Sequence, residues 1–158
     1  MFTLSIIGFS IIISYIVYCI IKCRCIPESI SATVYSLDNK NKWIYTIVIL
    51  LSAFLIAPHL FAITSTIGIE ILAYFTIVGM LGVGACPLIY GEKNTLHYGC
   101  AILMGTSSQV ISYLLCPYTM FLWIPYVVYT LYMDDGRWNM MFGEIIMTLT
   151  LLICGIVN

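Results

Sequence analysis

The sequence predicts an all-α, polytopic membrane protein: a bundle of six transmembrane helices in one transmembrane domain over 1–158. Three observations lead to this prediction: the composition, the lengths of the uncharged runs and the placement of the basic residues. Hydrophobic residues make up 62% of the 158 residues and charged residues only 8%, whereas a soluble domain carries about 25% charged residues. The polar surface is too small for a water-soluble globule, so a separate soluble catalytic domain is excluded.

The uncharged runs place the helices in order. A helix needs about 20 apolar residues to cross the hydrocarbon of a bilayer, and the first three runs fit one crossing each. The run 94–133 is long enough for two crossings and has to fold back at Pro117, because proline ends or kinks helices. The last run reaches full length only if it includes Glu144. We therefore predict helices over 3–21, 43–64, 68–89, 97–115, 119–133 and 139–157.

The basic residues fix the expected orientation. All six fall in odd-numbered gaps between the predicted helices: Lys22, Arg24, Lys40, Lys42, Lys93 and Arg137. Because basic loops stay in the cytoplasm, we expect both termini outside (N-out and C-out) and a multi-pass location in the inner, cytoplasmic membrane. The first helix is followed, not preceded, by its basic residues, which favours an N-out anchor over a cleaved signal peptide. The bilayer is the expected partner, and the absence of a basic patch argues against nucleic acid.

The segment 23–42 is the only long stretch expected outside the bilayer. Its apolar residues recur at helical spacing, at Ile26, Ile30, Val34 and Leu37. Pro27 suits the first turn of a helix. We therefore predict a short amphipathic helix that lies in the cytoplasmic interface. An extended loop is the alternative, because 30–35 also alternates.

Seven cysteines are present. Five lie in or at the ends of predicted helices and are interpreted as small packing residues: Cys19, Cys86, Cys100, Cys116 and Cys154. Cys23 and Cys25 belong to the cytoplasmic side, where thiols stay reduced. No further ligands accompany them, so we expect neither a metal site nor a cofactor.

Polar side chains on the predicted helices 97–115 and 139–157 form the first candidate site. His97, Ser108 and Ser112 share a face of the first of these helices with small residues, and Gln109 lies beside it. Small residues allow close helix approach, so this face should meet the stripe of the last helix. Glu144 then has to be protonated, paired or hydrated. The predicted polar or ion path consists of His97, Glu144, Ser108, Gln109, Ser112 and Thr148, and the alternative is a purely structural pair.

A second candidate site is predicted near the outer surface. Ser52 and His59 share one face of the helix 43–64, and Pro58 frees a backbone carbonyl just before the histidine. The turn to the next helix is short, so Glu70 is expected near His59. The same proline and histidine also suit a simple helix end.

Catalytic templates fit poorly. The sequence Gly105-Thr106-Ser107-Ser108 resembles the first half of the rhomboid serine-protease motif, but the final glycine is absent and the last helix contains no histidine. Two histidines in the whole chain exclude a three-histidine zinc site. No catalytic residue is assigned, and an enzyme is the minority interpretation.

Two stretches taken together resemble a known group of proteins. They are 29–35 (SISATVY) and 82–88 (GVGACPL), the latter followed by Glu92-Lys93 and by 97–101 (HYGCA). With this spacing, the chain resembles uncharacterised small six-helix integral membrane proteins of gut anaerobic bacteria and their phages. The resemblance implies a bacterial or phage inner-membrane protein, and it implies no activity.

Three functions remain open from the sequence. The chain is an accessory protein that binds another membrane protein or itself, through small-residue stripes or the segment 28–38. It is, equally, a small transporter or channel with Glu144 and His97 in its path. The alternative is an intramembrane enzyme that acts on lipid with Glu144 or His59 as acid or base. A closed, dry bundle would favour the first of these, and a polar cavity one of the other two.

Overall fold

The computed structural model describes residues 1–24, 26–37, 42–90, 94–132 and 139–158, and this part of the chain contains helices and no strand. This confirms the all-α prediction. In chain order the elements are α1 (Phe2–Cys23), α2 (Thr33–Ser36), α3 (Lys42–Ser65), α4 (Glu70–Ile89), α5 (Thr95–Leu115), the 3₁₀ helix η2 (Pro117–Leu122), α6 (Trp123–Tyr132) and α7 (Asn139–Val157).

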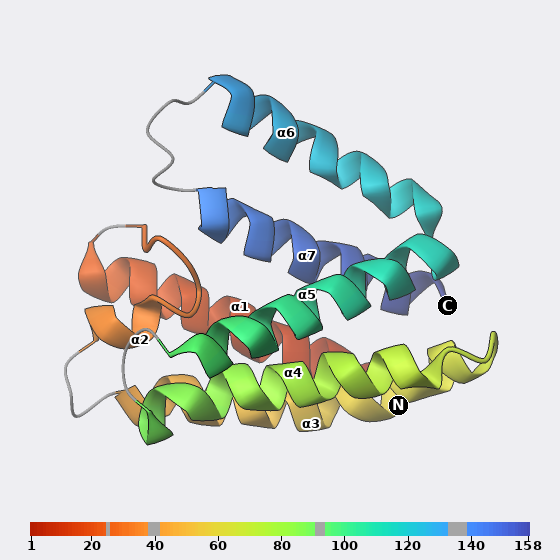
Figure 1. The fold of residues 1–158 in the computed structure, drawn as a ribbon, viewed down its shortest axis with the longest axis horizontal. Helices are drawn as coiled ribbons and strands as arrows, with labels where there is room; N and C mark the ends of the chain where they lie inside the picture. The colour runs from red at the N-terminus through yellow and green to blue at the C-terminus, as the bar shows by residue number, and fades with distance from the viewer. Residues whose placement is uncertain (25, 38–41, 91–93, 133–138) are drawn as a thin grey trace.

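The long helices lie side by side and alternate in direction, so that both chain ends fall at the same end of the bundle (Figure 1). α4 packs against α3 and α5, α1 against α3, and α7 against α5 and α1. α6 is outermost and packs on α7 and η2. None of its residues is buried. The core is therefore built by α1, α3, α4, α5 and α7.

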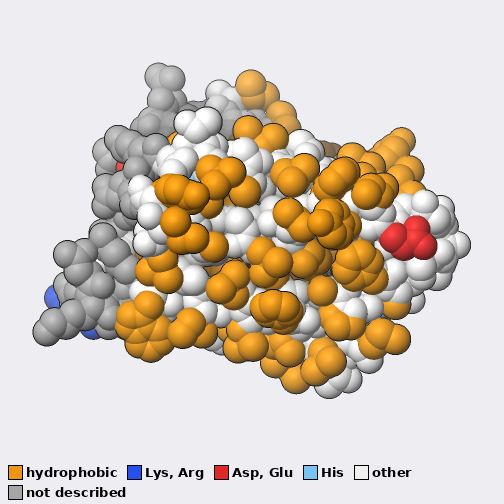
Figure 2. Space-filling view, turned by 60° about the horizontal axis from the view of Figure 1, so that its bottom comes forward, with side chains coloured by type: hydrophobic (Ala, Val, Ile, Leu, Met, Phe, Trp, Pro, Cys, Tyr) orange, Lys and Arg blue, Asp and Glu red, His pale blue; other side chains and the backbone are white. Residues whose placement is uncertain are grey.

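Four helices are long and apolar enough to cross a membrane: Phe2–Cys23, Trp43–Ser65, Glu70–Ile89 and Met140–Val157. Their outer faces are apolar, with Phe54, Ile71 and Ile156 each more than half exposed. Figure 2 shows hydrophobic side chains over most of one face, with charged side chains visible only near its two ends. Helices that are apolar on every side belong to a core or a membrane, and these features fit a polytopic membrane protein.

A glycine brings α4 and α5 into close contact. A Cβ atom built on Gly79 would lie 2.7 Å from the backbone nitrogen of Met104 and 2.8 Å from the carbonyl oxygen of Cys100. Next to this contact, Thr76 and Ser107 share a hydrogen bond of 2.9 Å between their hydroxyls. Small residues and hydroxyl pairs are the usual means of helix association in lipid, so this seam fixes the position of α5.

The chain turns at Pro117, which begins η2. The side-chain oxygen of Thr119 donates to the carbonyl of Cys116 at 2.7 Å, and its backbone amide donates to the same oxygen at 2.9 Å. A 3₁₀ helix rises about 2.0 Å per residue and an α-helix about 1.5 Å, so η2 and α6 together extend about 27 Å. The tighter helix thus lengthens a segment that would otherwise be short for a bilayer.

The segment after α1 differs from the predicted amphipathic helix. Only Thr33–Ser36 is helical, and Ile30, Val34 and Leu37 are buried in the protein core. The hydroxyls of Tyr15 and Thr33 lie 2.8 Å apart. The apolar stripe is real, but it packs against α1 and α3, because a turn-rich segment also buries residues spaced three or four apart. Asp38 lies outside the described residues.

Candidate functional site

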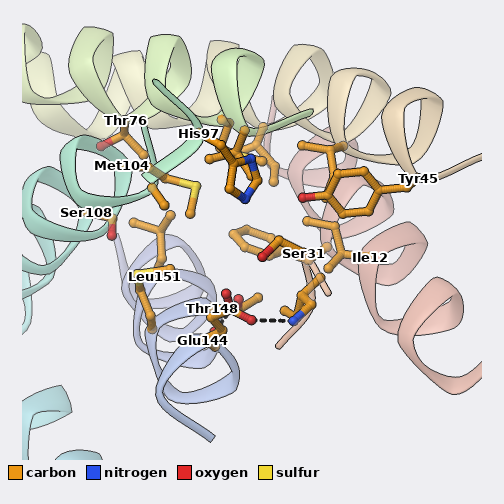
Figure 3. Close-up of a pocket in the computed structure, with 18 residues that line it drawn as sticks. Ile12, Ser31, Tyr45, Thr76, His97, Met104, Ser108, Glu144, Thr148 and Leu151 are labelled. Carbon is orange, nitrogen blue, oxygen red and sulfur yellow. Dashed lines mark hydrogen bonds between the residues drawn. The ribbon is translucent and has the colours of Figure 1, made fainter. Parts of the chain in front are cut away.

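A cavity of about 80 Å³ lies among α1, α3, α4, α5 and α7. Its walls are mostly apolar, from residues such as Phe9, Ile49 and Leu151. Polar side chains from five different segments line it: Ser31, Tyr45, Thr76, His97, Ser108, Glu144 and Thr148. Figure 3 shows His97 and Glu144 approaching this space from opposite walls. The volume suffices for several water molecules or a small solute.

His97 is held on the cavity wall by the first turn of α5. Asn94 caps this helix, since its side-chain oxygen accepts the backbone amide of Leu96 at 2.8 Å. The imidazole is 9% exposed, and its Nδ1 atom has no hydrogen-bond partner among the described residues. A buried polar atom without a partner is costly, so this nitrogen is available to a bound solute or water.

Glu144 approaches from α7, near the start of that helix. Its Oε2 atom accepts a hydrogen bond from the backbone amide of Ile30 (Figure 3). Within the described part of the chain this partner is a neutral backbone group, and Glu144 itself lines the cavity. Thr148, one turn later, donates its hydroxyl to the Glu144 carbonyl at 2.8 Å, and this bond fixes the orientation of its oxygen.

The hydroxyl oxygens of Ser108 and Thr148 on the cavity wall can accept hydrogen bonds. Ser108 donates to the carbonyl of Gly105 at 3.0 Å, as Thr148 does to Glu144. A hydroxyl whose proton is used in this way still carries lone pairs. Together with the Glu144 carboxylate, these oxygens suit a cation, a proton carried by water, or a solute that donates hydrogen bonds.

The cavity reaches only part of the way through the bundle. Along α5 its lining runs from His97 to Ser108, which is about 16 Å of helix. At the next residue, Gln109 bridges three elements. Its Nε2 donates to the Thr150 hydroxyl at 3.0 Å, and its Oε1 accepts from Trp123 Nε1 at 2.9 Å. This polar bridge joins α5, α6 and α7 one residue beyond the part of α5 that lines the cavity.

The six residues of the predicted polar path therefore fall into two groups in the structure. His97, Glu144, Ser108 and Thr148 line one cavity. Gln109 joins helices instead, and Ser112 is fully buried with an unpartnered Oγ among the described residues.

The three residues of the predicted outer site have different environments. His59 donates from Nε2 to the carbonyl oxygen of Gly155 at 2.8 Å, and its ring meets Phe2 edge-on, with 5.5 Å between centroids. Glu70 is exposed at the start of α4. Ser52 is fully buried, and its Oγ lacks a partner within the described ranges. His59 thus anchors the end of α7 to α3.

Three contributors to the cavity escaped the sequence reasoning. Ile30 supplies a backbone amide and Ser31 a hydroxyl, both from a segment that was expected outside the bundle. Tyr45 is fully buried at the wall. Its position was open to prediction, because Tyr45, Ile49, Ser52 and Ile56 recur at helical spacing on α3. Ile30 also belonged to a stripe at helical spacing, but that stripe was expected to face the membrane interface, and Ser31 carried no such signal.

No family model, curated protein or solved structure matches this chain.

Proposed function

We propose that this chain is a small transporter or channel of the bacterial or phage inner membrane, which binds a cation or a proton in the cavity between His97 and Glu144. The observation that carries this proposal is that α5 and α7 present these two ionisable groups to the same cavity. Ionisable residues inside a membrane-spanning bundle are costly and mark ion or proton pathways. A carboxylate surrounded by hydroxyl oxygens favours a positively charged occupant.

The proposed topology has six crossings with both termini outside. Four helices meet the length and composition of a membrane span. α5, at 21 residues, is long enough, and its polar residues explain its lower hydropathy. The combined length of η2 and α6, about 27 Å, approaches the roughly 30 Å of the hydrocarbon. In this topology His97 and Glu144 lie toward the cytoplasmic end of the bundle, which holds Lys22 and Arg24.

The Gln109 bridge gives this site the character of a half-channel. A solute that enters from the cytoplasmic end would meet Glu144 and His97 first, and the hydrogen bonds of Gln109 to Thr150 and Trp123 lie beyond the cavity along α5. Passage requires these bonds to open, which is the behaviour of a transporter that alternates between two accessible states.

The arrangement of the segment 28–38 supports an accessory role less well than a transport role. This segment was the expected docking surface, yet Ser29, Thr33 and Val34 are buried. An intramembrane enzyme would use the same cavity. Its candidate acid or base is Glu144, because His59 is engaged with Gly155.

The test measures the flux of cations and of protons into proteoliposomes, and it compares Glu144→Gln with wild type. Glu70→Gln is the matched control, because it removes the same charge from an exposed carboxylate at the start of α4. We expect flux from wild type and Glu70→Gln, and none from Glu144→Gln. A wild type that does not exceed empty vesicles, or a Glu144→Gln variant that transports normally, would overturn the proposal. Lipid turnover by the same vesicles would favour the enzyme instead.

A further inference from the structure

Two cysteines meet at the end of the bundle that holds both chain ends. Cys116 follows the last residue of α5, and Cys154 lies in the last turn of α7. Both side chains are fully buried. Both are free thiols in the structure, and one side chain, that of Asn158, contacts both sulfurs.

A third side chain links the two sulfurs. The Nδ2 atom of Asn158 donates to Cys116 Sγ at 3.0 Å and lies 4.0 Å from Cys154 Sγ. The Tyr118 hydroxyl also donates to Cys116 Sγ, at 3.5 Å. Cys116 Sγ therefore accepts two hydrogen bonds, and Asn158 at the end of α7 brings the two sulfurs to the same place.

The backbone on both sides of the pair is fixed. The amide of Cys116 donates to the Ser112 carbonyl at 2.8 Å, and its carbonyl accepts from Thr119. The Cys154 carbonyl accepts from Asn158 at 3.0 Å. A disulfide forms only when the two Cβ atoms are held close and point toward each other. These bonds fix each segment locally, and the bond from Asn158 to Cys116 Sγ joins the end of α7 to the end of α5.

A second pair of thiols lies at the opposite end of the bundle. Cys86 on α4 is 3% exposed, and Cys100 of α5 packs on the same helix, because a Cβ atom built on Gly82, one turn before Cys86, would lie 2.3 Å from Cys100 Sγ. In the proposed topology this pair lies toward the cytoplasm, where thiols remain reduced, whereas Cys116 and Cys154 lie toward the oxidising side. The two pairs therefore differ in compartment more than in local packing.

We propose that Cys116 and Cys154 form an intramolecular disulfide that joins the end of α5 to the end of α7. The oxidant is a disulfide donor of the compartment outside the membrane. One thiolate attacks a sulfur of the donor and releases a donor thiol. The second thiolate then attacks the resulting mixed disulfide, which forms the Cys116–Cys154 bond and releases the second donor thiol. Two protons and two electrons leave the cysteine pair, and the donor is reduced to a dithiol. Because both sulfurs are buried in the folded bundle, the exchange takes place as α7 docks.

The experiment traps thiols in intact cells that express the full chain. Cells are quenched with acid, and free thiols are blocked with N-ethylmaleimide under denaturing conditions. The purified chain is then digested without reductant and mapped by mass spectrometry. We expect a linked peptide pair that contains Cys116 and Cys154, which disappears after reduction, while Cys86 and Cys100 carry the label. In Cys116→Ser, Cys154 should become labelled, and Cys86→Ser should leave the link intact.

Two results would overturn the inference. Full labelling of both Cys116 and Cys154 in wild type would exclude the disulfide and would leave the ion-binding proposal standing, because flux is measured separately. A link between Cys86 and Cys100 instead would show that the orientation is inverted, and would contradict both the disulfide and the proposed topology. The wild-type peptide map decides the question even if a serine variant fails to fold.

Discussion

The backbone amide of Ile30 donates a hydrogen bond to the carboxylate of Glu144, across 114 positions of the chain. The segment after α1 is thereby bound to α7, the last helix of the bundle. The carboxylate that we propose to bind the transported cation also accepts a hydrogen bond from a buried backbone amide. Its two oxygens therefore have separate roles, and substitutions that keep one of them should separate stability from transport.

Replacement of Glu144 by alanine should destabilise the bundle, whereas replacement by glutamine should not. Alanine leaves the Ile30 amide without an acceptor, and an unsatisfied buried donor costs about 1–3 kcal/mol. Glutamine retains an oxygen at nearly the same place. Thermal unfolding in detergent checks this expectation. Equal stability of the two variants would mean that water replaces the carboxylate as acceptor, and that the segment 26–37 is held by other contacts.

Substitution of Gly79 by alanine should push α4 and α5 apart. The added methyl group would collide with the backbone of Met104 and Cys100, and overpacking of this kind costs about 1–3 kcal/mol. Gly99 on the same helix pair is the matched control, because a Cβ atom there meets nothing within 4 Å. Gly99→Ala should stabilise α5 by up to about 1 kcal/mol. Unfolding midpoints that shift in the same direction for both variants would contradict the close approach.

Gln109 and Trp123 should be energetically coupled. In a double-mutant cycle of Gln109→Leu and Trp123→Phe, we expect a coupling of about 0.5–2 kcal/mol, the range of interhelical hydrogen bonds in membranes. The reason is the 2.9 Å bond that attaches the start of α6 to α5. The two single variants and the double variant are each unfolded in detergent, and their free energies of unfolding are compared. Additive effects would show that packing alone holds α6.

His59 should matter for stability and not for flux. Loss of its bond to Gly155 in His59→Ala should destabilise the protein by about 1–2 kcal/mol, while the exposed Glu70→Gln should change stability by less than about 0.5 kcal/mol. Transport by His59→Ala is measured on folded protein below its unfolding temperature. Loss of flux under those conditions would restore the outer site that the sequence suggested.

The sequence alone was sufficient to predict the helices, because the features that define a helix are local in the chain. Hydropathy and run length predict an all-α bundle, and the missing amide of Pro117 predicts the break at which α5 ends. Helical spacing on α5 and α7 was likewise enough to place His97 and Ser108, and Glu144 and Thr148, on faces that share a cavity.

The environment of an apolar stripe is not a local property. Ile30, Val34 and Leu37 have the spacing of a helix on a lipid surface, yet they are buried in the bundle. Periodicity states which residues share a face and leaves open what covers that face. The same reason applies to Gln109. Its position beside the polar stripe of α5 suggested a path, and its amide is used instead to bridge Thr150 and Trp123.

The cavity takes its walls from both ends of the chain, with Phe9 and Ile12 on α1 and Glu144 and Leu151 on α7. During biosynthesis the first helix therefore enters the bilayer long before its partner across the cavity has been translated. Until that moment the face of α1 that carries Phe9 and Ile12 lacks its neighbours on α7, and the cavity is incomplete. A nascent chain truncated before α7 would be a membrane-inserted product that lacks the carboxylate altogether.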